Sequence, residues 1–388
     1  MSVKKIYALY PGINNLEKAI KWLRVSDLEF AKNFVWDDVK PDYIIASDKI
    51  YAEAWYAQKF LELVSNNPDS IRIFLTGEAI LPDFNIFDYA ITPNYDFAFM
   101  DRFARRLYYF VPSYGTPDGI NDLTFNAAKS LITSKKRFCN FLYSNGKAHP
   151  YRDKLFHAVS EYKRVESLGP HLNNVNTLIT RNGGGGLRLS PDAMNFSAEL
   201  KSHYKFSIAC ENARYYGYTS EKLLTSFSAH TVPIYWGNPV VAQEYNPEAF
   251  INCHDYSSFD EIIKRIREID EDDDLWSYMV SQPWQTEEQR RAAELERRSY
   301  EEFMTNIFTQ PLEKAKRHPK GFWPGIYEVC FWRGLPEPRT LSSRIMGLVK
   351  HPSLIIDRIQ RRLIKVFPSL DRKPKLKLTD INDFFRDD

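Results

Sequence analysis

The sequence lacks features that mark disulfide-rich, membrane-spanning and nucleic-acid-binding proteins. Its 388 residues include only four cysteines, which lie far apart and form no CxxC pair, so neither a disulfide framework nor a cysteine zinc cluster is indicated. No run of about 18 uncharged apolar residues occurs, which excludes a membrane-spanning helix. The net charge of +2 gives no reason to expect a nucleic-acid-binding protein.

The N-terminal stretch MSVKKIYALYPGINN has too short an apolar run for a secretory signal peptide. With the scattered cysteines, this favours a reducing compartment, and we expect a cytoplasmic protein. What the sequence does contain is ample material for packed interiors, because 44% of the residues are hydrophobic and 15% are aromatic. A chain of this length exceeds one ordinary core, so two domains are expected.

Short apolar runs alternate with amphipathic segments, which predicts an α/β fold with parallel sheets. The runs typical of strands are KKIYALY, PDYIIAS, IRIFLTG and FDYAIT in the first part, and FCNFLYS, YKFSIACEN, TVPIYWG and AFINC in the second. The helical patterns are YAEAWYAQKFLELV, RDKLFHAVSEY, SEKLLTSFSAH and SFDEIIKRIREI. We expect one domain over residues 1–134, a second over 135–335, and a separate C-terminal region over 336–388, with TSKKR near Ser134 as the linker.

Two conspicuous segments carry little functional weight. RNGGGGLRLS lacks the third glycine of a dinucleotide-binding loop and does not lie cleanly between a strand and a helix, which favours a flexible insertion. The acidic run from Asp270 to Asp274 is more typical of a solvated helix end than of a metal site, because contiguous carboxylates repel one another.

The stretch ENARYYGYTSEKLL, from Glu211 to Leu224, is placed where a ligand would bind. The apolar strand FSIAC precedes it, and a helix begins within it with Thr219 or Ser220 as the N-cap. Ligands of open α/β sheets bind beyond the carboxyl ends of strands, in such a strand-to-helix loop.

The charges of this stretch indicate an anion. Lys222 lies in the first turn of the expected helix, where the helix dipole is already positive, so a negative partner is required. Backbone N–H groups, the dipole and the ammonium group would together hold a phosphate, with Asn212 and Tyr218 as neutral donors beside it. The alternative is that Lys222 extends to solvent and pairs with Glu221 or Glu211.

The wider pattern resembles a known family. The segment ACENARYYGYTSEKLLTSFSAHTVPIYWGNPVVAQEYNPEAFINCHDYSSFDE resembles the donor-binding signature of the α1,3/4-fucosyltransferases, and most closely that of the bacterial members. The likeness lies in the E-N pair Glu211-Asn212, in G-Y-T-S-E-K ending at Lys222, and in V-P-I-Y-W-G. Weaker likeness extends to FCNFLYSNGKAHPYRDKLFHAV and FLTGEAILPDFNIFDYAI.

The resemblance implies a GT-B glycosyltransferase, with two Rossmann-like domains that face a central cleft. The first domain would bind the acceptor and the second would bind GDP-β-L-fucose. The product would be an α-L-fucoside, so the reaction inverts the anomeric centre in a single displacement. No cofactor or metal is implied, because fixed cations and donors stabilise the departing GDP.

The resemblance also assigns roles to residues. Arg152, in HPYRDKLF, and Lys222 would be the cations beside the pyrophosphate, since the Arg fork binds phosphate oxygens at two points. Asn212 and Tyr218 would bind phosphate or sugar, and Glu221 would accept hydrogen bonds from the ribose hydroxyls. The implied donor-binding set is Arg152, Glu211, Asn212, Tyr218, Glu221 and Lys222.

The expected catalytic base is Glu78. It follows Thr76 and Gly77 at the end of the strand RIFLT, where the candidate base of the family falls, and a glycine before it permits a sharp turn. The competing interpretation is a surface carboxylate that caps or pairs within its loop.

The C-terminal region is basic. From Arg344 to Lys377 there are ten Lys and Arg against two Asp and Glu, and apolar residues recur at helical spacing in SLIIDRIQRRLIKVF. Such a helix either lies on an anionic membrane surface, bringing the enzyme to a lipid-linked glycan, or packs across the domains with a solvated basic side.

Three function classes remain open at this point: an active fucosyltransferase, a catalytically inactive GDP-sugar-binding protein, and a nucleic-acid or membrane adaptor that uses the basic tail. The family likeness favours transfer and argues against the adaptor. It suggests the 3-hydroxyl, and less often the 4-hydroxyl, of N-acetylglucosamine in a galactose-containing glycan, with a Lewis-antigen-like product in lipopolysaccharide O-antigen. Neutral sugars are bound by side chains of many kinds, so the residues alone leave several acceptor glycans open.

Overall fold

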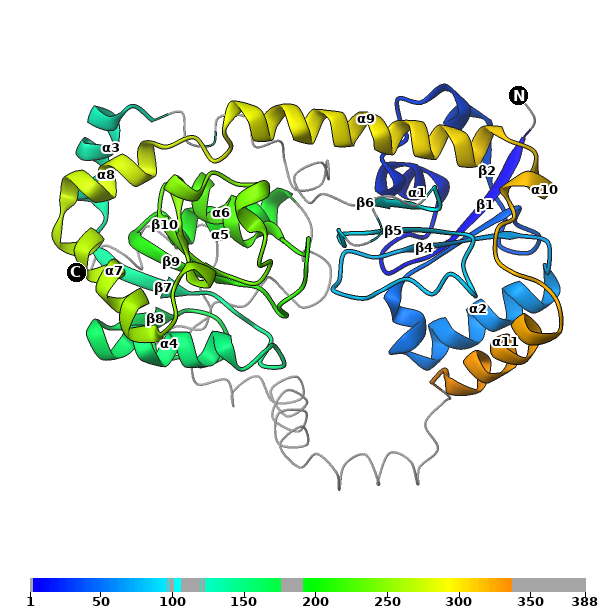
Figure 1. The fold of residues 1–388 in the computed structure, drawn as a ribbon, viewed down its shortest axis with the longest axis horizontal. Coiled ribbons are helices and arrows are strands. Elements are labelled where there is room, and N and C mark those ends of the chain that lie inside the picture. The colour runs from blue at the N-terminus through cyan, green and yellow to red at the C-terminus, as the bar shows by residue number, and fades with distance from the viewer. Residues whose placement is uncertain are drawn as a thin grey trace, which may run out of the picture.

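The protein folds into two α/β units joined by a long helix (Figure 1). The computed structural model describes residues 3–95, 97, 101–105, 120, 123–175 and 191–336. Each unit contains one sheet whose strands all run parallel, with helices against both faces. The expected pair of Rossmann-like domains is therefore confirmed.

The first sheet has six strands in the order β2-β1-β3-β4-β5-β6. Its strands are β1 (Lys4–Leu9), β2 (Phe34–Trp36), β3 (Tyr43–Ala46), β4 (Ile71–Leu75), β5 (Tyr89–Thr92) and β6 (Phe103–Arg105). Every residue of β3, β4, β5 and β6 is buried, as expected for parallel strands covered on both faces. Four of these strands coincide with predicted runs, and the three-residue strands β2 and β6 were not predicted.

The second sheet has five strands in the order β11-β10-β9-β7-β8. Its strands are β7 (Arg137–Phe141), β8 (Val165–Ser167), β9 (Tyr204–Cys210), β10 (Val232–Trp236) and β11 (Ile251–Asn252). Only the short edge strand β8 lies outside the predicted runs. The longest register runs along β9, which pairs with β10 from Phe206 to Cys210 and so fixes where the strand-to-helix loop after Cys210 begins.

Helices pack against both sheets, and the long connecting helix reaches the cores of both units. Those near the first sheet in sequence are α1 (Leu16–Leu23) and α2 (Ala54–Asn66), and those that follow are α3 (Phe125–Leu131), α4 (Tyr151–Tyr162), α5 (Pro191–Lys201), α6 (Glu221–Ser228), α7 (Phe259–Glu271), α8 (Asp273–Ser281), α9 (Glu287–Thr309), α10 (Leu312–Ala315) and α11 (Phe322–Gly334). The four predicted helical patterns correspond to α2, α4, α6 and α7. Ser258 caps α7 by accepting the N–H of Glu261, which is typical of such a helix start.

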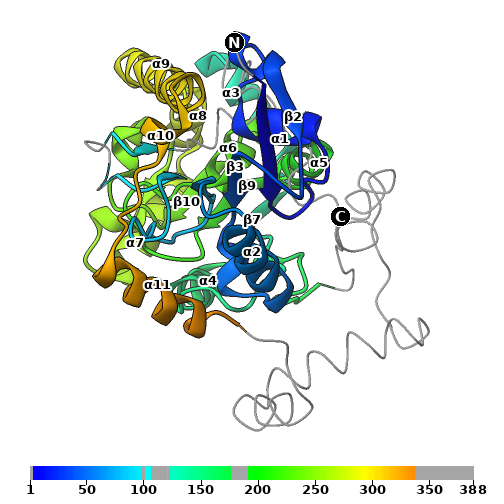
Figure 2. The same cartoon turned by 90° about the vertical axis from the view of Figure 1, so that its right-hand side faces the viewer.

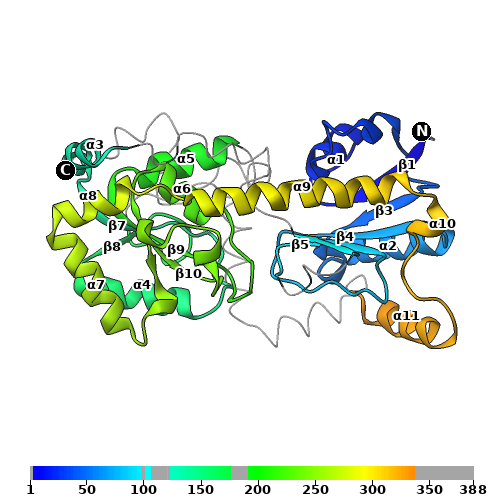
Figure 3. The same ribbon diagram turned by 45° about the horizontal axis from the view of Figure 1, so that its top comes forward.

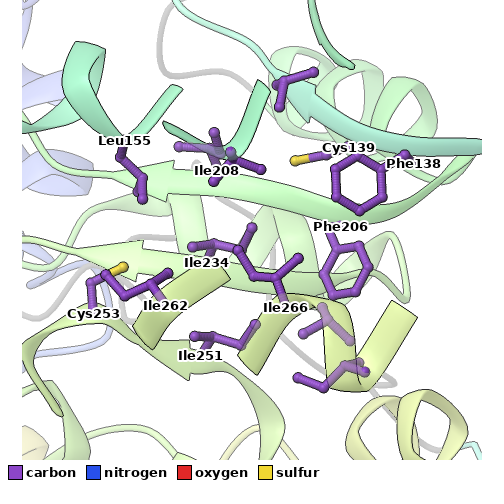
Figure 4. Packing of buried hydrophobic residues seen from close by; sticks show 14 of the residues in the cluster. Phe138, Cys139, Leu155, Phe206, Ile208, Ile234, Ile251, Cys253, Ile262 and Ile266 are labelled. Atoms are coloured by element: carbon purple, nitrogen blue, oxygen red, sulfur yellow. The ribbon is translucent and has the colours of Figure 1, made fainter. Parts of the chain in front are cut away.

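Alternating side chains place β1 between two cores. Ile6 and Ala8 pack with α1 and with the end of α9, whereas Leu9 packs with α2 on the opposite face. Figure 2 shows α9 and α2 on these two sides of the sheet. The second sheet is built in the same way, and its largest core contains aromatic, aliphatic and cysteine side chains (Figure 4). Phe206 and Ile208 of β9 pack there against Ile234 of β10.

Helix α9 crosses from the second unit to the first (Figure 3). It starts with a capping box at Thr286, and its end buries Met304, Ile307 and Phe308 against the first sheet. This part of the chain falls within the expected second domain, residues 135–335, but in the structure the end of α9 covers the first sheet. In the opposite sense, α3 precedes the expected linker yet contacts α8 of the second unit. Lys135, within that linker, is buried and donates to the carbonyls of Ser202 and Ala229.

Two predicted segments lie outside the described residues: the glycine run in RNGGGGLRLS and the basic region from Arg344 to Lys377. None of the helices within the described ranges has the length and hydropathy needed to cross a bilayer.

Candidate active site

The site lies where the carboxyl ends of β4 and β9 approach each other from the two units. Gly217, in the loop after β9, adopts φ 86°, and a side chain there would collide with the carbonyl oxygen of Pro93 beyond β5. Glycine is therefore required by both the backbone conformation and the close approach. This contact brings the loop of the second unit against the first sheet.

Glu78 lies on the side of the site that the first unit forms, which we call the first side; the second unit forms the second side. Its backbone N–H donates to Oγ1 of Thr76 at 3.0 Å, and its Oε2 accepts from the hydroxyl of Tyr218 at 3.1 Å. The side chain is exposed, but surrounding protein atoms still desolvate the carboxyl group, and this raises the pKa of Glu78. Asp48 raises it further, whereas the Tyr218 hydrogen bond and the charge of Lys222 oppose the shift.

Glu211 and Lys222 form the centre of the second side. The fully buried Glu211 carboxylate accepts from Nζ of Lys222 at 2.8 Å and from the N–H of Ser220 at 2.7 Å. The Ser220 hydroxyl also donates to both Glu211 oxygens. Burial works to lower the pKa of Lys222, but the charge of Glu211, with those of Glu221 and Glu78, raises it overall, so the ammonium group stays charged.

The helix start at α6 differs from the expected form in one detail. Ser220 is the N-cap residue, one of the two predicted positions, but its side chain does not cap the helix. It binds Glu211 instead. The first-turn N–H groups of α6 are therefore not occupied by the capping side chain, at the end of the helix that favours anions.

Tyr218 links the two sides. It is almost fully buried, and burial together with the carboxylates Glu211, Glu78 and Glu221 raises the pKa of its hydroxyl well above the usual value. The hydroxyl therefore remains protonated and donates to Glu78. The structure places this residue, which is part of the loop predicted to bind the donor, beside the predicted base.

Arg152 and Asn212 form an adjoining pair. Arg152 lies in the first turn of α4 and is 1% exposed; its guanidinium donates to Oδ1 of Asn212 at 3.3 Å and to the carbonyl of Asn145. The guanidinium carbon lies 4.3 Å from the centroid of the Tyr143 ring. Nε of Arg152 makes no hydrogen bond within the described residues, and it lies 3.8 Å from Oδ1 of Asp153 in an ion pair.

The structure thus bonds Tyr218 to Glu78 and Lys222 to Glu211, and Arg152 contacts Asn212 in the same strand-to-helix loop. Glu221 begins α6 and acts on Tyr218 and Lys222 through its charge. Three contributing residues were not predicted as members of the site: Asp48, Thr76 and Ser220. Asp48 follows a predicted strand just as Glu78 does, and that position was the available signal.

Two other acidic features lie elsewhere. Asp270 accepts hydrogen bonds from Lys163 and Tyr162 and forms an ion pair with Lys205, and Asp272 caps α8, so these members of the acidic run have structural partners. In the described part of the chain, no three His, Cys, Asp or Glu side chains gather as a metal-binding group.

A cavity of about 480 Å³ lies between β6, α9 and the loop after β10. Its wall contains Arg105, which pairs with Glu244 at 2.5 Å and with Glu296 at 2.8 Å. These three charges join the first sheet, the second unit and α9, so the cavity belongs to the junction between the units. None of the seven predicted site residues lines it.

Comparison with solved structures identifies the class of fold. A crystal structure of an α1,3-fucosyltransferase aligns with 82% of this chain and 93% of its own length, with a TM-score of 0.60 and 22% identity. The crystal structure of α1,3-fucosyltransferase with GDP-fucose aligns with 80% of this chain and 91% of that one, with a TM-score of 0.58 and the same identity. The two facing Rossmann-like domains are therefore of the GT-B type.

Sequence comparison then gives the family. Residues 132–320 match the sequence profile of the glycosyltransferase family 10 (fucosyltransferase) C-terminal region. Residues 20–112 match that of the alpha-(1,3)-fucosyltransferase FucT N-terminal domain. The chain belongs to glycosyltransferase family 10, the fucosyltransferases, as the sequence analysis expected.

Curated relatives agree with this assignment. Alpha-(1,3)-fucosyltransferase FucT of Helicobacter pylori is 31% identical over 233 residues, which cover 54% of this chain and 48% of that protein. An alpha-(1,4)-fucosyltransferase of Arabidopsis thaliana is 29% identical over 140 residues, 34% of each chain. The chain thus spans about half the length, or less, of these relatives.

Proposed function

We propose that this protein is an inverting α1,3-fucosyltransferase that moves L-fucose from GDP-β-L-fucose to N-acetylglucosamine in a galactose-containing glycan. The observation that carries the proposal is the hydrogen bond between Tyr218 and Glu78, which joins a carboxylate of the first unit to the loop of the second unit that also carries the Glu211–Lys222 pair. A transfer reaction needs a base on one reactant and a cationic site on the other, and this arrangement supplies both.

The donor would lie against the second unit. The first turn of α6 offers backbone N–H groups and a positive dipole end to the pyrophosphate, and Lys222 adds a charged donor. Arg152 adds a charged, planar guanidinium fork that suits phosphate oxygens. The buried Glu211 holds Lys222 in place, so the cation is positioned before the donor arrives.

The reaction would be a single displacement. The acceptor hydroxyl loses its proton to Glu78 as its oxygen attacks C1 of fucose, and the bond from C1 to the β-phosphate oxygen breaks. The negative charge that develops on GDP is stabilised by Arg152, Lys222 and the helix N-terminus. Attack from the face opposite the leaving group converts the β-linked donor into an α-linked product.

Glu78 suits the role of base. Its raised pKa makes it a stronger proton acceptor than an ordinary surface carboxylate. The hydroxyl of Tyr218 occupies one carboxylate oxygen and leaves the other for the acceptor. This supports an active enzyme over a GDP-sugar-binding protein, for which a tuned carboxylate at this place has no use.

The test is acceptor-dependent release of GDP from GDP-fucose, measured with chelator present and over a panel of acceptors. N-Acetyllactosamine should stimulate release, and linkage analysis should give an α1,3-linked fucose. An α1,4 linkage would replace the proposed regiochemistry and leave fucosyl transfer intact. Donor binding without release on any glycan of the panel would favour the inactive binding protein.

The basic region from Arg344 to Lys377 supports a second part of the proposal, a cytoplasmic enzyme held at an anionic membrane surface where lipid-linked glycans are found. Its excess of positive charge is a property of the sequence, and each exposed basic residue adds about 1 kcal/mol to such binding. Full-length protein should float with liposomes that contain anionic lipid and not with neutral ones. Absence of flotation would favour the packed helix.

A further inference from the structure

A second carboxylate lies beside the proposed base. Strands β3 and β4 are parallel neighbours, with Ala46 paired to Phe74, so both strands end at the same edge of the sheet. Asp48 follows β3 by two residues and Glu78 follows β4 by three. The topology therefore places two acidic side chains of the first unit close together, on the side that faces the donor loop.

Hydrogen bonds connect the two residues through Thr76. The N–H of Glu78 donates to Oγ1 of Thr76 at 3.0 Å, and Oγ1 of Thr76 donates to Oδ1 of Asp48 at 2.8 Å. Thr76 is completely buried. Because its oxygen accepts from Glu78, its single proton is directed at Asp48, which fixes the hydroxyl and with it the turn that carries Glu78.

The charges around Glu78 come from both units. Asp48 is the negative charge of its own unit that acts on Glu78, and Glu211 is a second one across the interface. Lys222 and the hydroxyl of Tyr218 act in the opposite sense. Desolvation raises the pKa of Glu78 most, and Asp48 is the next largest cause in the same direction.

We propose that Asp48 is a positioning residue for the base, which fixes the Glu78 turn through Thr76 and strengthens Glu78 as a proton acceptor by its negative charge. This inference rests on the proposed function, because it concerns the step in which the acceptor hydroxyl gives its proton to Glu78. The hydrogen bond from Thr76 to Asp48 restricts the position of Glu78. The negative charge of Asp48 disfavours the ionised form of Glu78, so Glu78 takes up a proton more readily.

The substitution Asp48→Asn separates charge from shape. The amide oxygen still accepts the Thr76 hydroxyl, but the negative charge is gone. The acidic limb of the pH profile of kcat/KM should move to lower pH, since Glu78 then loses its proton more readily. At the plateau, kcat should fall by about 5-fold to 20-fold, a part of the roughly 10²-fold to 10⁴-fold that a general base contributes. Affinity for GDP-fucose should stay unchanged.

Two matched variants complete the design. Asp42→Asn removes the same charge at the opposite end of β3, where the carboxylate accepts the N–H of Lys5 at 2.8 Å, and it should leave the pH profile unmoved. Thr76→Val keeps the Asp48 charge but breaks the connection, so it should lower kcat without moving the limb to lower pH. If the valine variant fails to fold, Thr76→Ser is tested in its place. It keeps the hydroxyl and should behave like the wild type.

A measurement without turnover keeps the inference apart from the proposed function. Carbon-13 NMR of labelled glutamate carboxyls, with the Glu78 signal assigned by its loss in Glu78→Gln, follows the titration of Glu78 directly. Asp48→Asn should lower its midpoint. An unmoved midpoint, or a pH profile shifted equally by Asp42→Asn, would overturn the role of Asp48 while fucosyl transfer by the wild type stood. Absence of transfer by the wild type would overturn the proposed function, and the NMR titration would still decide the effect of Asp48 on Glu78.

Discussion

The two sides of the site are built differently. On the second unit, the charges of Glu211 and Lys222 are buried and mutually paired, and Arg152 is enclosed by Asn212 and Asn145. On the first unit, Glu78 is exposed, and its side chain is held only by a hydroxyl from the opposite unit among the hydrogen bonds of the described residues. One side is organised before any ligand binds, whereas the other presents a carboxylate that can react.

This difference matches two separate tasks. A leaving group that gains charge is stabilised most by donors that need no rearrangement, which requires buried and fixed cations. A base must meet a hydroxyl that arrives from solvent, which requires access and a suitable pKa. The comparison predicts that substitutions on the first side change the rate, and that those on the second side change donor affinity and stability.

The largest effect is expected at Glu78. Glu78→Gln keeps the shape and the acceptor for Tyr218 but cannot take a proton, so kcat should fall by roughly 10²-fold to 10⁴-fold. Calorimetry should give the wild-type affinity for GDP-fucose, because the donor residues are untouched. The exposed Glu17→Gln on α1 is the matched control. Near-wild-type transfer by Glu78→Gln would show that Glu78 is not the base.

The next effect concerns stability. Glu211→Gln removes the partner of Lys222 and leaves a largely buried ammonium group uncompensated, so the free energy of unfolding should fall by about 3–5 kcal/mol. Urea denaturation measures this. Adding Lys222→Met should restore part of the loss, since the unpaired charge is then absent. Unchanged stability in the single variant would show that the second side is not held by this pair.

Donor affinity should respond to Arg152. Arg152→Lys keeps the charge but loses the planar fork and the stacking on Tyr143, and GDP should bind about 10-fold to 100-fold more weakly. Arg291→Lys, on the exposed face of α9, is the matched control. Loss of kcat with unchanged GDP affinity would contradict the division of tasks, because Arg152 would then act on the rate alone.

The smallest effect is expected where the two sides meet. Tyr218→Phe removes the hydroxyl that lowers the pKa of Glu78, so the acidic limb of the pH profile should move to higher pH. This direction is opposite to that expected for Asp48→Asn. The loss in kcat should be only about 3-fold to 10-fold, comparable to the net contribution of one hydrogen bond. A shift to lower pH would mean that Tyr218 does not stabilise the ionised form of Glu78.

Much of the fold could be predicted because its central strands are fully buried parallel strands with distinctive apolar runs. The three-residue strands β2, β6 and β8 are too short to carry a pattern, and they form only beside longer neighbours. The crossing of α9 depends on which distant core its end covers. Its amphipathic sequence predicts a helix but does not determine which sheet Met304 and Phe308 pack against.

The site was predictable to a similar degree. The loop after β9 follows from its place at a strand end, and the resemblance supplied Arg152, Glu78 and the E-N pair. The sequence left open whether Lys222 pairs with Glu211, Glu221 or a ligand, and the structure places it on Glu211. Asp48 was missed because the register between β3 and β4 decides that it lies beside Glu78, and the order of strands in a sheet cannot be deduced from either strand alone.

The most direct measurement is proton NMR of GDP-β-L-fucose mixed with N-acetyllactosamine and the wild-type protein, followed over time. We predict that the β-fucosyl signal of the donor decreases only when the acceptor is present, and that an α-linked fucoside appears in equal amount. A β-linked product, or loss of the donor signal at the same rate without acceptor, would contradict single displacement between a base on the first unit and GDP on the second.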